Sequence, residues 1–217
     1  PRGTSAPRRL NLGELREQVA RLATRMRQWG VGPGDRVAAF LPNLPEAVVG
    51  MLAASSLGAA WSSCSPDFGV SGVLDRFGQI EPKLLLACDG YFYKGKAIDV
   101  RDKLREVLAG LPTVAQTVLV PFADPDARVD GAVRWDEALG DGPAPPLRFA
   151  RLPFDQPLYV MFSSGTTGKP KCIVHGQGGH LLPPLTEHQL HCDLRPGAPL
   201  FSFTTTRWLM WTWLVPG

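Results

Sequence analysis

Two short apolar segments in the first half of the chain lack the polar–apolar alternation of a strand with one face in water. Arg36–Leu41 has the apolar core VAAFL, and Ala59–Ser63 is the next such run. Strands buried on both faces have this pattern. A helical pattern over Glu46–Leu57 separates them, so residues 36–63 form a β-α-β unit with a right-handed crossover. The unit requires a parallel sheet.

The same order of elements continues to residue 120. A helix is expected through Val73, Phe77 and Ile80, and a strand over Lys83–Cys88. Asp89–Lys96 is expected to form a polar, aromatic loop. It is followed by an amphipathic helix over residues 98–111 and a strand over Thr117–Val120. The predicted fold class is therefore α/β, doubly wound, with mostly parallel sheets and flanking helices.

Two helix starts carry capping signals. Asn11 precedes an apolar helical stripe that runs to Trp29, and Glu14 stands where a capping-box partner belongs. Asn43, followed by proline and by Glu46, predicts the start of the second helix. Both signals place an asparagine side chain on the first free backbone N–H groups of its helix.

Composition changes after residue 120. Residues 121–157 hold seven prolines and are expected to form a surface excursion with one helical turn over Val133–Leu139. We therefore expect three parts: a first β-α-β subdomain at 1–120, this excursion, and a part at 158–217. In the last part we expect a helix over Gly178–Cys192, kinked or interrupted at Pro183-Pro184, and a strand over Leu200–Thr204.

The stretch Tyr159–Lys171 reads YVMFSSGTTGKPK. An apolar strand leads into a small hydroxyl-rich loop with two lysines, and a second strand follows. Converging N–H and O–H groups in such a loop suit phosphate oxygens. The common nucleotide loop needs four residues between its glycines and then Lys-Ser/Thr. That pattern is absent here, so the alternatives are a different phosphate loop or an ordinary turn between strands.

Charge and cysteine content exclude several classes. The net charge is +3, with +5 in residues 1–36, which indicates a solvated basic helix and not a nucleic-acid-binding protein. The four cysteines show no CxxC pair and are expected to be reduced, as in a cytoplasmic protein. The apolar run Trp208–Val215 is too short to cross a membrane.

The phosphate loop SSGTTGKPK resembles the signature of adenylate-forming enzymes. Within them, three stretches resemble acetoacetyl-CoA synthetases: Trp61–Lys96, Cys172–Leu182 and Thr204–Val215. This resemblance implies an ATP-dependent ligase that activates acetoacetate as an acyl-adenylate and transfers it to CoA, with Mg²⁺. The alternatives are a non-catalytic piece that only binds nucleotide or CoA, and a synthetase for acetate or another short acid.

The resemblance also implies roles for residues. The phosphates would be bound by Ser163, Ser164, Gly165, Thr166, Thr167, Gly168 and Lys169. Lys171 either assists catalysis or is only the exposed end of a strand. Lys94 and Lys96 either approach the CoA 3′-phosphate or belong to a solvated loop. Trp208, Leu209 and Met210 would line the acyl pocket, or else form part of the core.

Several features are expected to limit activity. Arg207 stands where the resembling enzymes have glycine, and a large cation there would block the pocket. The chain resembles part of a large N-terminal domain, without adenine-binding motif, hinge or C-terminal domain, so we expect no turnover by it alone.

His188, His191 and Cys192 have helical spacing but no evident fourth ligand, so no metal site is predicted. His175 is expected in the core or beside the nucleotide.

Overall fold

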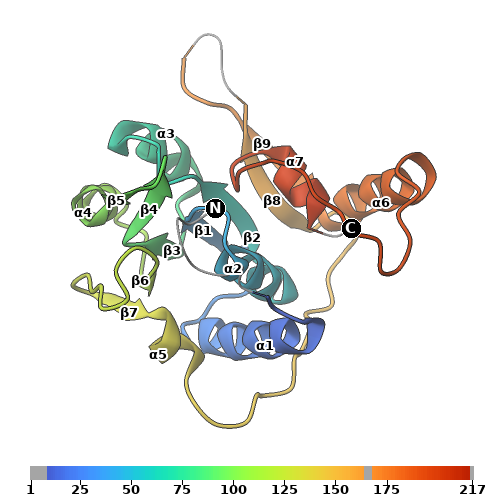
Figure 1. The fold of residues 1–217 in the computed structure, drawn as a ribbon, viewed down its shortest axis with the longest axis horizontal. Helices are drawn as coiled ribbons and strands as arrows, with labels where there is room; N and C mark the ends of the chain where they lie inside the picture. The colour runs from blue at the N-terminus through green and yellow to red at the C-terminus, as the bar shows by residue number, and fades with distance from the viewer. Residues whose placement is uncertain (1–8, 164–167, 216–217) are drawn as a thin grey trace.

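A computed structural model describes residues 9–163 and 168–215 of the 217-residue chain. Its main sheet contains β1 (Arg36–Phe40), β2 (Ala60–Cys64), β3 (Leu84–Cys88), β6 (Gln116–Val120), β7 (Ala132–Arg134), β8 (Pro157–Phe162) and β9 (Cys172–Gly176). The strand order is β7-β6-β3-β1-β2-β8-β9 (Figure 1). All neighbours are parallel except β8 and β9, which are antiparallel. The predicted α/β class is confirmed.

Helices flank both faces of this sheet. They are α1 (Leu12–Gln28), α2 (Pro45–Ser56), α3 (Val70–Ile80), α4 (Arg101–Ala109), α5 (Trp135–Leu139), α6 (Gln177–Thr186), the π-helix η1 (Glu187–His191) and α7 (Leu209–Leu214). The β1-α2-β2 and β2-α3-β3 crossovers run in opposite directions across the sheet. Because such crossovers are right-handed, α2 and α3 lie on opposite faces. Helix α1 packs on α2 and α5, whereas α3 packs on α4. The sheet is therefore doubly wound, as predicted.

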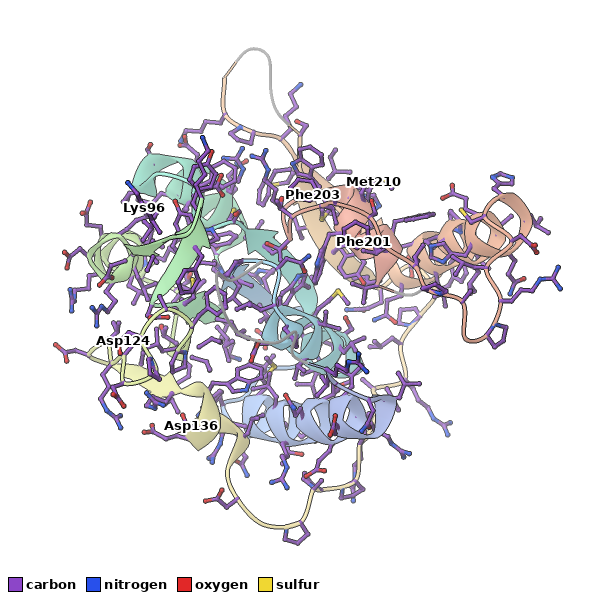
Figure 2. All side chains as sticks on the ribbon, in the orientation of Figure 1. Lys96, Asp124, Asp136, Phe201, Phe203 and Met210 are labelled. Atoms are coloured by element: carbon purple, nitrogen blue, oxygen red, sulfur yellow. The ribbon has the colours of Figure 1, made fainter. Side chains whose placement is uncertain are left out.

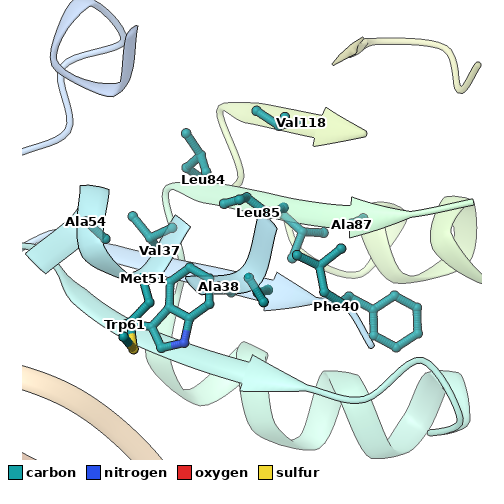
Figure 3. Close-up of a cluster of buried hydrophobic side chains, with 14 of the residues drawn as sticks. Val37, Ala38, Phe40, Met51, Ala54, Trp61, Leu84, Leu85, Ala87 and Val118 are labelled. Atoms are coloured by element: carbon teal, nitrogen blue, oxygen red, sulfur yellow. The ribbon is translucent and has the colours of Figure 1, made fainter. Parts of the chain in front are cut away.

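The core lies where α2 meets the centre of the sheet (Figure 3). Trp61 on β2 and Leu86 on β3 are fully buried there. A Cβ atom at Gly50 on α2 would lie 2.7 Å from Leu86 Cδ2 and 3.1 Å from the Trp61 ring. Glycine at this position thus lets α2 pack directly onto the strands.

One of the two capping predictions is confirmed. Asn11 Oδ1 accepts from the Glu14 backbone N–H at 2.9 Å, and Glu14 Oε2 accepts from the Asn11 N–H at 2.8 Å. The prediction for Asn43 is wrong, because Leu44 is the residue that precedes α2 and it makes no side-chain cap. Asn43 instead accepts a hydrogen bond from Trp211 Nε1 at 3.0 Å. The Asn43 side chain is thus used in a contact 168 positions away in the sequence, and not in the expected cap of α2.

Two further expectations need correction. Residues 89–96 contain structure, because β4 (Gly90–Tyr93) and β5 (Lys96–Asp99) form an antiparallel hairpin and β5 takes the beginning of the predicted 98–111 helix. The segment Leu200–Thr204 is not a strand. Phe201 and Phe203 are 87% and 91% exposed there, so this apolar run has no strand to pair with among the described residues (Figure 2).

The two adjacent prolines do not end their helix. Pro183 and Pro184 lie inside α6, which continues into η1. The ring of proline fixes φ near the helical value, so a helix that loses two N–H donors still keeps its backbone path. After the prolines the backbone hydrogen bonds span five residues, as in a π-helix: the Cys192 N–H donates to the Glu187 carbonyl at 2.9 Å. The expected interruption is thus replaced by a π-helical turn after the prolines.

The proline-rich residues 121–157 contain β7 and α5, and the rest is mostly irregular. The predicted helical turn over Val133–Leu139 corresponds to α5, which begins at Trp135. None of the helices in the described residues is long and apolar enough to span a bilayer.

We expect two of the four thiols to react with a disulfide reagent in the native protein and all four after unfolding. Cys64 and Cys88 are buried, and burial raises the pKa of each thiol to about 12, so neither forms the reactive thiolate. Cys172 and Cys192 are exposed. Counting released thionitrobenzoate with and without guanidinium checks this, and rapid native labelling of three or four thiols would contradict the burial.

Candidate functional site

The segment that contains the predicted phosphate loop is a β-hairpin. Strands β8 and β9 pair from Pro157↔Gly176 to Phe162↔Cys172. At the open end, the Ser163 N–H donates to the Lys171 carbonyl at 3.0 Å, and the Lys171 N–H donates to Ser163 Oγ at 3.4 Å. The predicted strand–loop–strand arrangement is confirmed. Ser164, Gly165, Thr166 and Thr167, the centre of the predicted loop, lie outside the described residues.

Helix α3 anchors the returning half of this loop. Gln79 Nε2 donates to the Pro170 carbonyl at 2.9 Å, and Gln79 Oε1 lies 3.7 Å from Cys172 Sγ. The Lys169 ammonium lies 4.0 Å from Asp75 on the same helix, and both side chains are substantially exposed. Gly168 has φ of +119°, a conformation that favours glycine. The loop is therefore tied to α3 through Gln79, while Lys169 is held only by a weak, solvated ion pair.

A cavity of about 860 Å³ lies at the carboxyl ends of the parallel strands. Its lining comes from the segments that follow β1, β2, β3 and β6 and from the segment before α7: Pro42, Asn43, Ser65, Pro66, Asp67, Tyr91, Phe92, Tyr93, Lys94, Gly95, Phe122, Phe203 and Thr205. Because α2 and α3 leave toward opposite faces, the loops diverge there. Ligands of open α/β sheets bind at such a point.

The β4–β5 hairpin presents the two lysines predicted for this region. Lys94 and Gly95 both have positive φ, 49° and 79°, which is typical of a tight two-residue hairpin turn. The Lys94 ammonium lies 5.5 Å from the Tyr93 ring centroid, and Lys94 lines the cavity. Lys96 begins β5 and is exposed (Figure 2). The structure thus brings Lys94 to the cavity, whereas Lys96, in the same hairpin, is not among the residues that line it.

Sequence reasoning missed Asp89, which holds the backbone of Phe122, a residue that lines this cavity. Asp89 is only 2% exposed, and its carboxylate accepts from three consecutive backbone N–H groups. They belong to Phe122 at 2.6 Å, Ala123 at 3.1 Å and Asp124 at 2.6 Å. Asp89 therefore ties the end of β3 to the end of β6. The available signal was an acid directly after the apolar strand LLLAC.

The segment before α7 is fixed to the same edge of the sheet. Thr206 Oγ1 donates to the Leu41 carbonyl at 2.9 Å, and Ser63 Oγ donates to the Thr206 carbonyl. This places Trp208, Leu209 and Met210 next to the ends of β1 and β2. All three side chains are about half exposed, so they do not form core among the described residues. The structure brings the predicted acyl-pocket segment to the edge that carries the phosphate loop.

Three rings meet edge to face where α6 packs on the β8–β9 hairpin. His180 on α6 contacts Tyr159 on β8 and His175 on β9, with ring centroids 4.7 Å and 5.5 Å apart. Burial lowers the pKa of His180, and a hydrogen bond with the Thr212 backbone opposes that shift. His175 therefore belongs to the packing between the hairpin and α6.

Lowering the pH below 6.5, the ordinary histidine pKa, is expected to weaken the fold through His180. Because its folded pKa is lowered, the unfolded chain binds the proton more readily, so stability present above pH 6.5 is lost as pH falls. Urea unfolding of wild type and His180→Asn at pH 7.5 and 5.5 measures this. We expect a smaller pH difference in the variant, and the exposed His191→Asn serves as control. Equal pH dependence in both variants would count against the assignment.

The histidines of the EHQLHC segment do not meet at one point. His188 is buried against the Trp213 ring, with centroids 4.3 Å apart, whereas His191 and Cys192 are exposed. Within the described ranges, no group of three His, Cys, Asp or Glu side chains is arranged to hold a metal ion.

Comparison with known proteins addresses the family. A sequence profile described as AMP-binding enzyme matches residues 4–215, almost the whole chain. The chain belongs to the AMP-binding enzyme family. This membership agrees with a glycine- and hydroxyl-rich loop at the carboxyl edge of a doubly wound sheet.

Individual relatives narrow the resemblance. The chain is 55% identical over 213 residues to acetoacetyl-coenzyme A synthetase of Rhizobium meliloti (strain 1021), covering 96% of this chain and 32% of the relative. It is 49% identical over 210 residues to acetoacetyl-CoA synthetase of Mus musculus, covering 93% and 31%. Malonamoyl-CoA synthetase vrtB of Penicillium aethiopicum is 41% identical over 213 residues, covering 94% and 30%. The predicted resemblance to acetoacetyl-CoA synthetases is confirmed.

A solved structure agrees with these relatives. The acetoacetyl-CoA synthetase from Streptomyces lividans superposes with a TM-score of 0.92 at 48% identity, covering 97% of this chain and 32% of that one. The chain thus spans about a third of the length of the family members it matches. Its fold is that of the corresponding third.

Proposed function

We propose that the chain is the phosphate-binding part of an ATP-dependent acid–CoA ligase that activates acetoacetate. The observation that carries the proposal is the β8–β9 hairpin, which holds a Ser/Thr/Gly/Lys loop at the carboxyl edge of the sheet beside the 208–210 segment. The family match and the acetoacetyl-CoA synthetase relatives support it. The reaction would consume ATP, CoA and acetoacetate and release AMP, pyrophosphate and acetoacetyl-CoA.

In the proposed mechanism the chain binds and orients. The 163–169 loop would hold the β- and γ-phosphates through N–H and hydroxyl donors, and Lys169 would leave Asp75 to meet them. Mg²⁺ would arrive with ATP and neutralise phosphate charge. Lys171 would assist from the end of β9, next to Ser163. Trp208, Leu209 and Met210 would place the acid so that its carboxylate faces the α-phosphate in line.

We further propose that the large cavity receives the nucleotide end of CoA, with Lys94 and Lys96 near the 3′-phosphate. Lys94 lines that cavity, and Lys96 is exposed in the same hairpin, which supports the assignment. We also propose that the protein acts in the cytoplasm, in ketone-body and lipid metabolism. The division into 1–120, 121–157 and 158–217 remains a proposal too.

We expect CoA to bind more tightly than dephospho-CoA, by about fivefold, because one or two exposed lysine contacts to a phosphate are worth up to about 1 kcal/mol each. In Lys94→Ala/Lys96→Ala this preference should vanish. Competition titrations with a fluorescent CoA analogue measure it, and Arg16→Ala/Arg27→Ala, at two exposed positions of α1, is a control that removes the same two charges outside the hairpin. Equal affinity for both ligands in wild type would remove the 3′-phosphate role.

The reaction is tested by acid-dependent exchange of labelled pyrophosphate into ATP. The panel compares acetoacetate, acetate, butyrate and malonamate, using a polypeptide of the relatives' length that contains this sequence. Acetoacetate should give the fastest exchange. Exchange that no acid stimulates would reject the ligase, and fastest exchange with acetate or malonamate would reassign the acid. Malonamate is included because one relative is a malonamoyl-CoA synthetase.

A further inference from the structure

A second, smaller cavity carries two arginines. It measures about 360 Å³ and lies at the carboxyl ends of β2 and β8, between the phosphate-loop hairpin and the 208–210 segment. Its lining combines three aromatic rings with a hydroxyl and two guanidinium groups: Phe68, Phe162, Trp208, Ser63, Arg76 and Arg207. Arg207 thus does not simply fill the acyl region, as the sequence suggested, but forms one wall of an open space.

Both guanidinium groups stack on the same ring. Arg76 Cζ lies 4.5 Å from the Phe68 centroid, and Arg207 Cζ lies 5.1 Å from that centroid and 5.5 Å from the Trp208 ring. Arg76 Nη1 also donates to the Gly72 carbonyl at 2.7 Å, one turn earlier in α3. A guanidinium carries five N–H donors in its plane, and contact of its face with an aromatic ring leaves those N–H groups free to donate. Both side chains are therefore held in place with donors to spare.

The two positive charges are not neutralised locally. Among residues 9–163 and 168–215, no carboxylate lies within ion-pairing distance of Arg76 or Arg207. Asp75, the sequence neighbour of Arg76, pairs with Lys169 instead. Both arginines also act at the end of β2, since each lowers the pKa of Cys64 against the larger, raising effect of burial. Two uncompensated charges beside apolar rings suit a small ligand that carries more than one oxyanion.

We propose that Arg76 and Arg207 form a clamp for the oxygen group at the third carbon of a short acid substrate, binding a second carboxylate most strongly. The proposal rests on the proposed acid-activating function and names its class of acid. The reacting carboxylate must face the α-phosphate, so a plain alkanoic acid leaves the guanidinium groups without a partner. Malonate places its second carboxylate there and acetoacetate its ketone, whereas the third carbon of butyrate is a methylene that carries no oxygen.

Direct binding to the 217-residue chain tests this order. Trp208 lies in the cavity, so tryptophan fluorescence is titrated with malonate, acetoacetate and butyrate, and Trp208→Phe identifies its share of the signal. We expect malonate to bind at least about tenfold more tightly than butyrate, with acetoacetate between them, because hydrogen bonds to charged groups are the stronger ones. Arg207→Gln should remove most of the malonate preference, and Arg207→Lys should keep part of it.

The controls separate a clamp from a general charge effect. Arg105→Gln removes an exposed arginine on α4 and should leave the three affinities unchanged. Arg207 is exposed, and thermal melting of Arg207→Gln should match wild type. Equal affinities for malonate and butyrate, or a malonate preference that survives Arg207→Gln, would overturn the proposal. Displacement of malonate by equal concentrations of inorganic phosphate would overturn it as well, since the cavity would then recognise charge alone.

The outcome is distinguishable from failure of the proposed function. ATP binding to the same chain is measured separately and does not involve the clamp. Malonate preference without ATP binding would leave the clamp standing and reject the phosphate-loop assignment. ATP binding with no discrimination among the acids would reject the clamp and leave the phosphate-loop assignment standing.

Discussion

Asp89→Ala is expected to lower the free energy of unfolding by about 3 kcal/mol or more, since each unsatisfied buried polar group costs roughly 1–3 kcal/mol. Three consecutive N–H groups, at residues 122–124, lose their acceptor in this variant. Water can reach only part of them, because they are partly buried at the end of β6. The Phe122 side of the large cavity and the junction of β3 with β6 should loosen together.

Urea unfolding followed by circular dichroism measures the effect. Asp89→Asn keeps one oxygen acceptor and should lose about half as much stability. Asp102→Ala, in a side chain that is 95% exposed, is the matched control and should change little. A loss below about 1 kcal/mol for Asp89→Ala would mean that the N–H groups find other acceptors. The structural role given to Asp89 would then be wrong.

Lys169→Ala is expected to weaken ATP binding by about tenfold or more, because charge-assisted hydrogen bonds to phosphate contribute about 1.5–3 kcal/mol. The Lys169 side chain is 76% exposed, and its closest approach to Asp75 is 4.0 Å. Only this weak ion pair holds the ammonium away from a nucleotide. Neutralising Asp75, which competes with ATP for Lys169, should have the opposite effect on ATP affinity. Asp75→Asn should therefore bind ATP somewhat more tightly than wild type.

Isothermal titration calorimetry with Mg-ATP gives both affinities. Arg16→Ala, on the exposed side of α1, removes the same charge from a helix on the other side of the sheet from α3 and serves as control. Weaker ATP binding in Asp75→Asn would show that Asp75 helps to place Lys169 and does not compete for it. An unchanged affinity in Lys169→Ala would remove this lysine from the site.

The sheet was predictable because its signals are local. Uninterrupted apolar runs such as VAAFL identify strands that both helix layers cover, and the helical patterns between them fix the crossover topology. The errors arose where distant residues decide. Asn43 carries a capping signal, but Trp211 takes its side chain. Phe201 and Phe203 have the composition of a strand, but none of the described strands pairs with them.

The candidate site divides in the same way. The phosphate-loop hairpin follows from YVMFSSGTTGKPK and its flanking strands, so sequence alone located it. No local sequence pattern identified the residues that hold the loop and the cavity in place. Gln79 contacts Pro170 across 91 positions, and Asp89 contacts residue 122 across 33. The clamp of Arg76 and Arg207 joins α3 to the segment before α7, and no local spacing predicts that meeting.

The most direct test of the central claim is a calorimetric comparison of ATP with AMP on the 217-residue chain. If the 163–169 loop holds the β- and γ-phosphates, ATP should bind at least about tenfold more tightly than AMP, since AMP lacks the groups that make the charge-assisted contacts. Lys169→Ala should narrow that ratio. Equal affinities for ATP and AMP in a folded sample would contradict the assignment of a phosphate-binding loop.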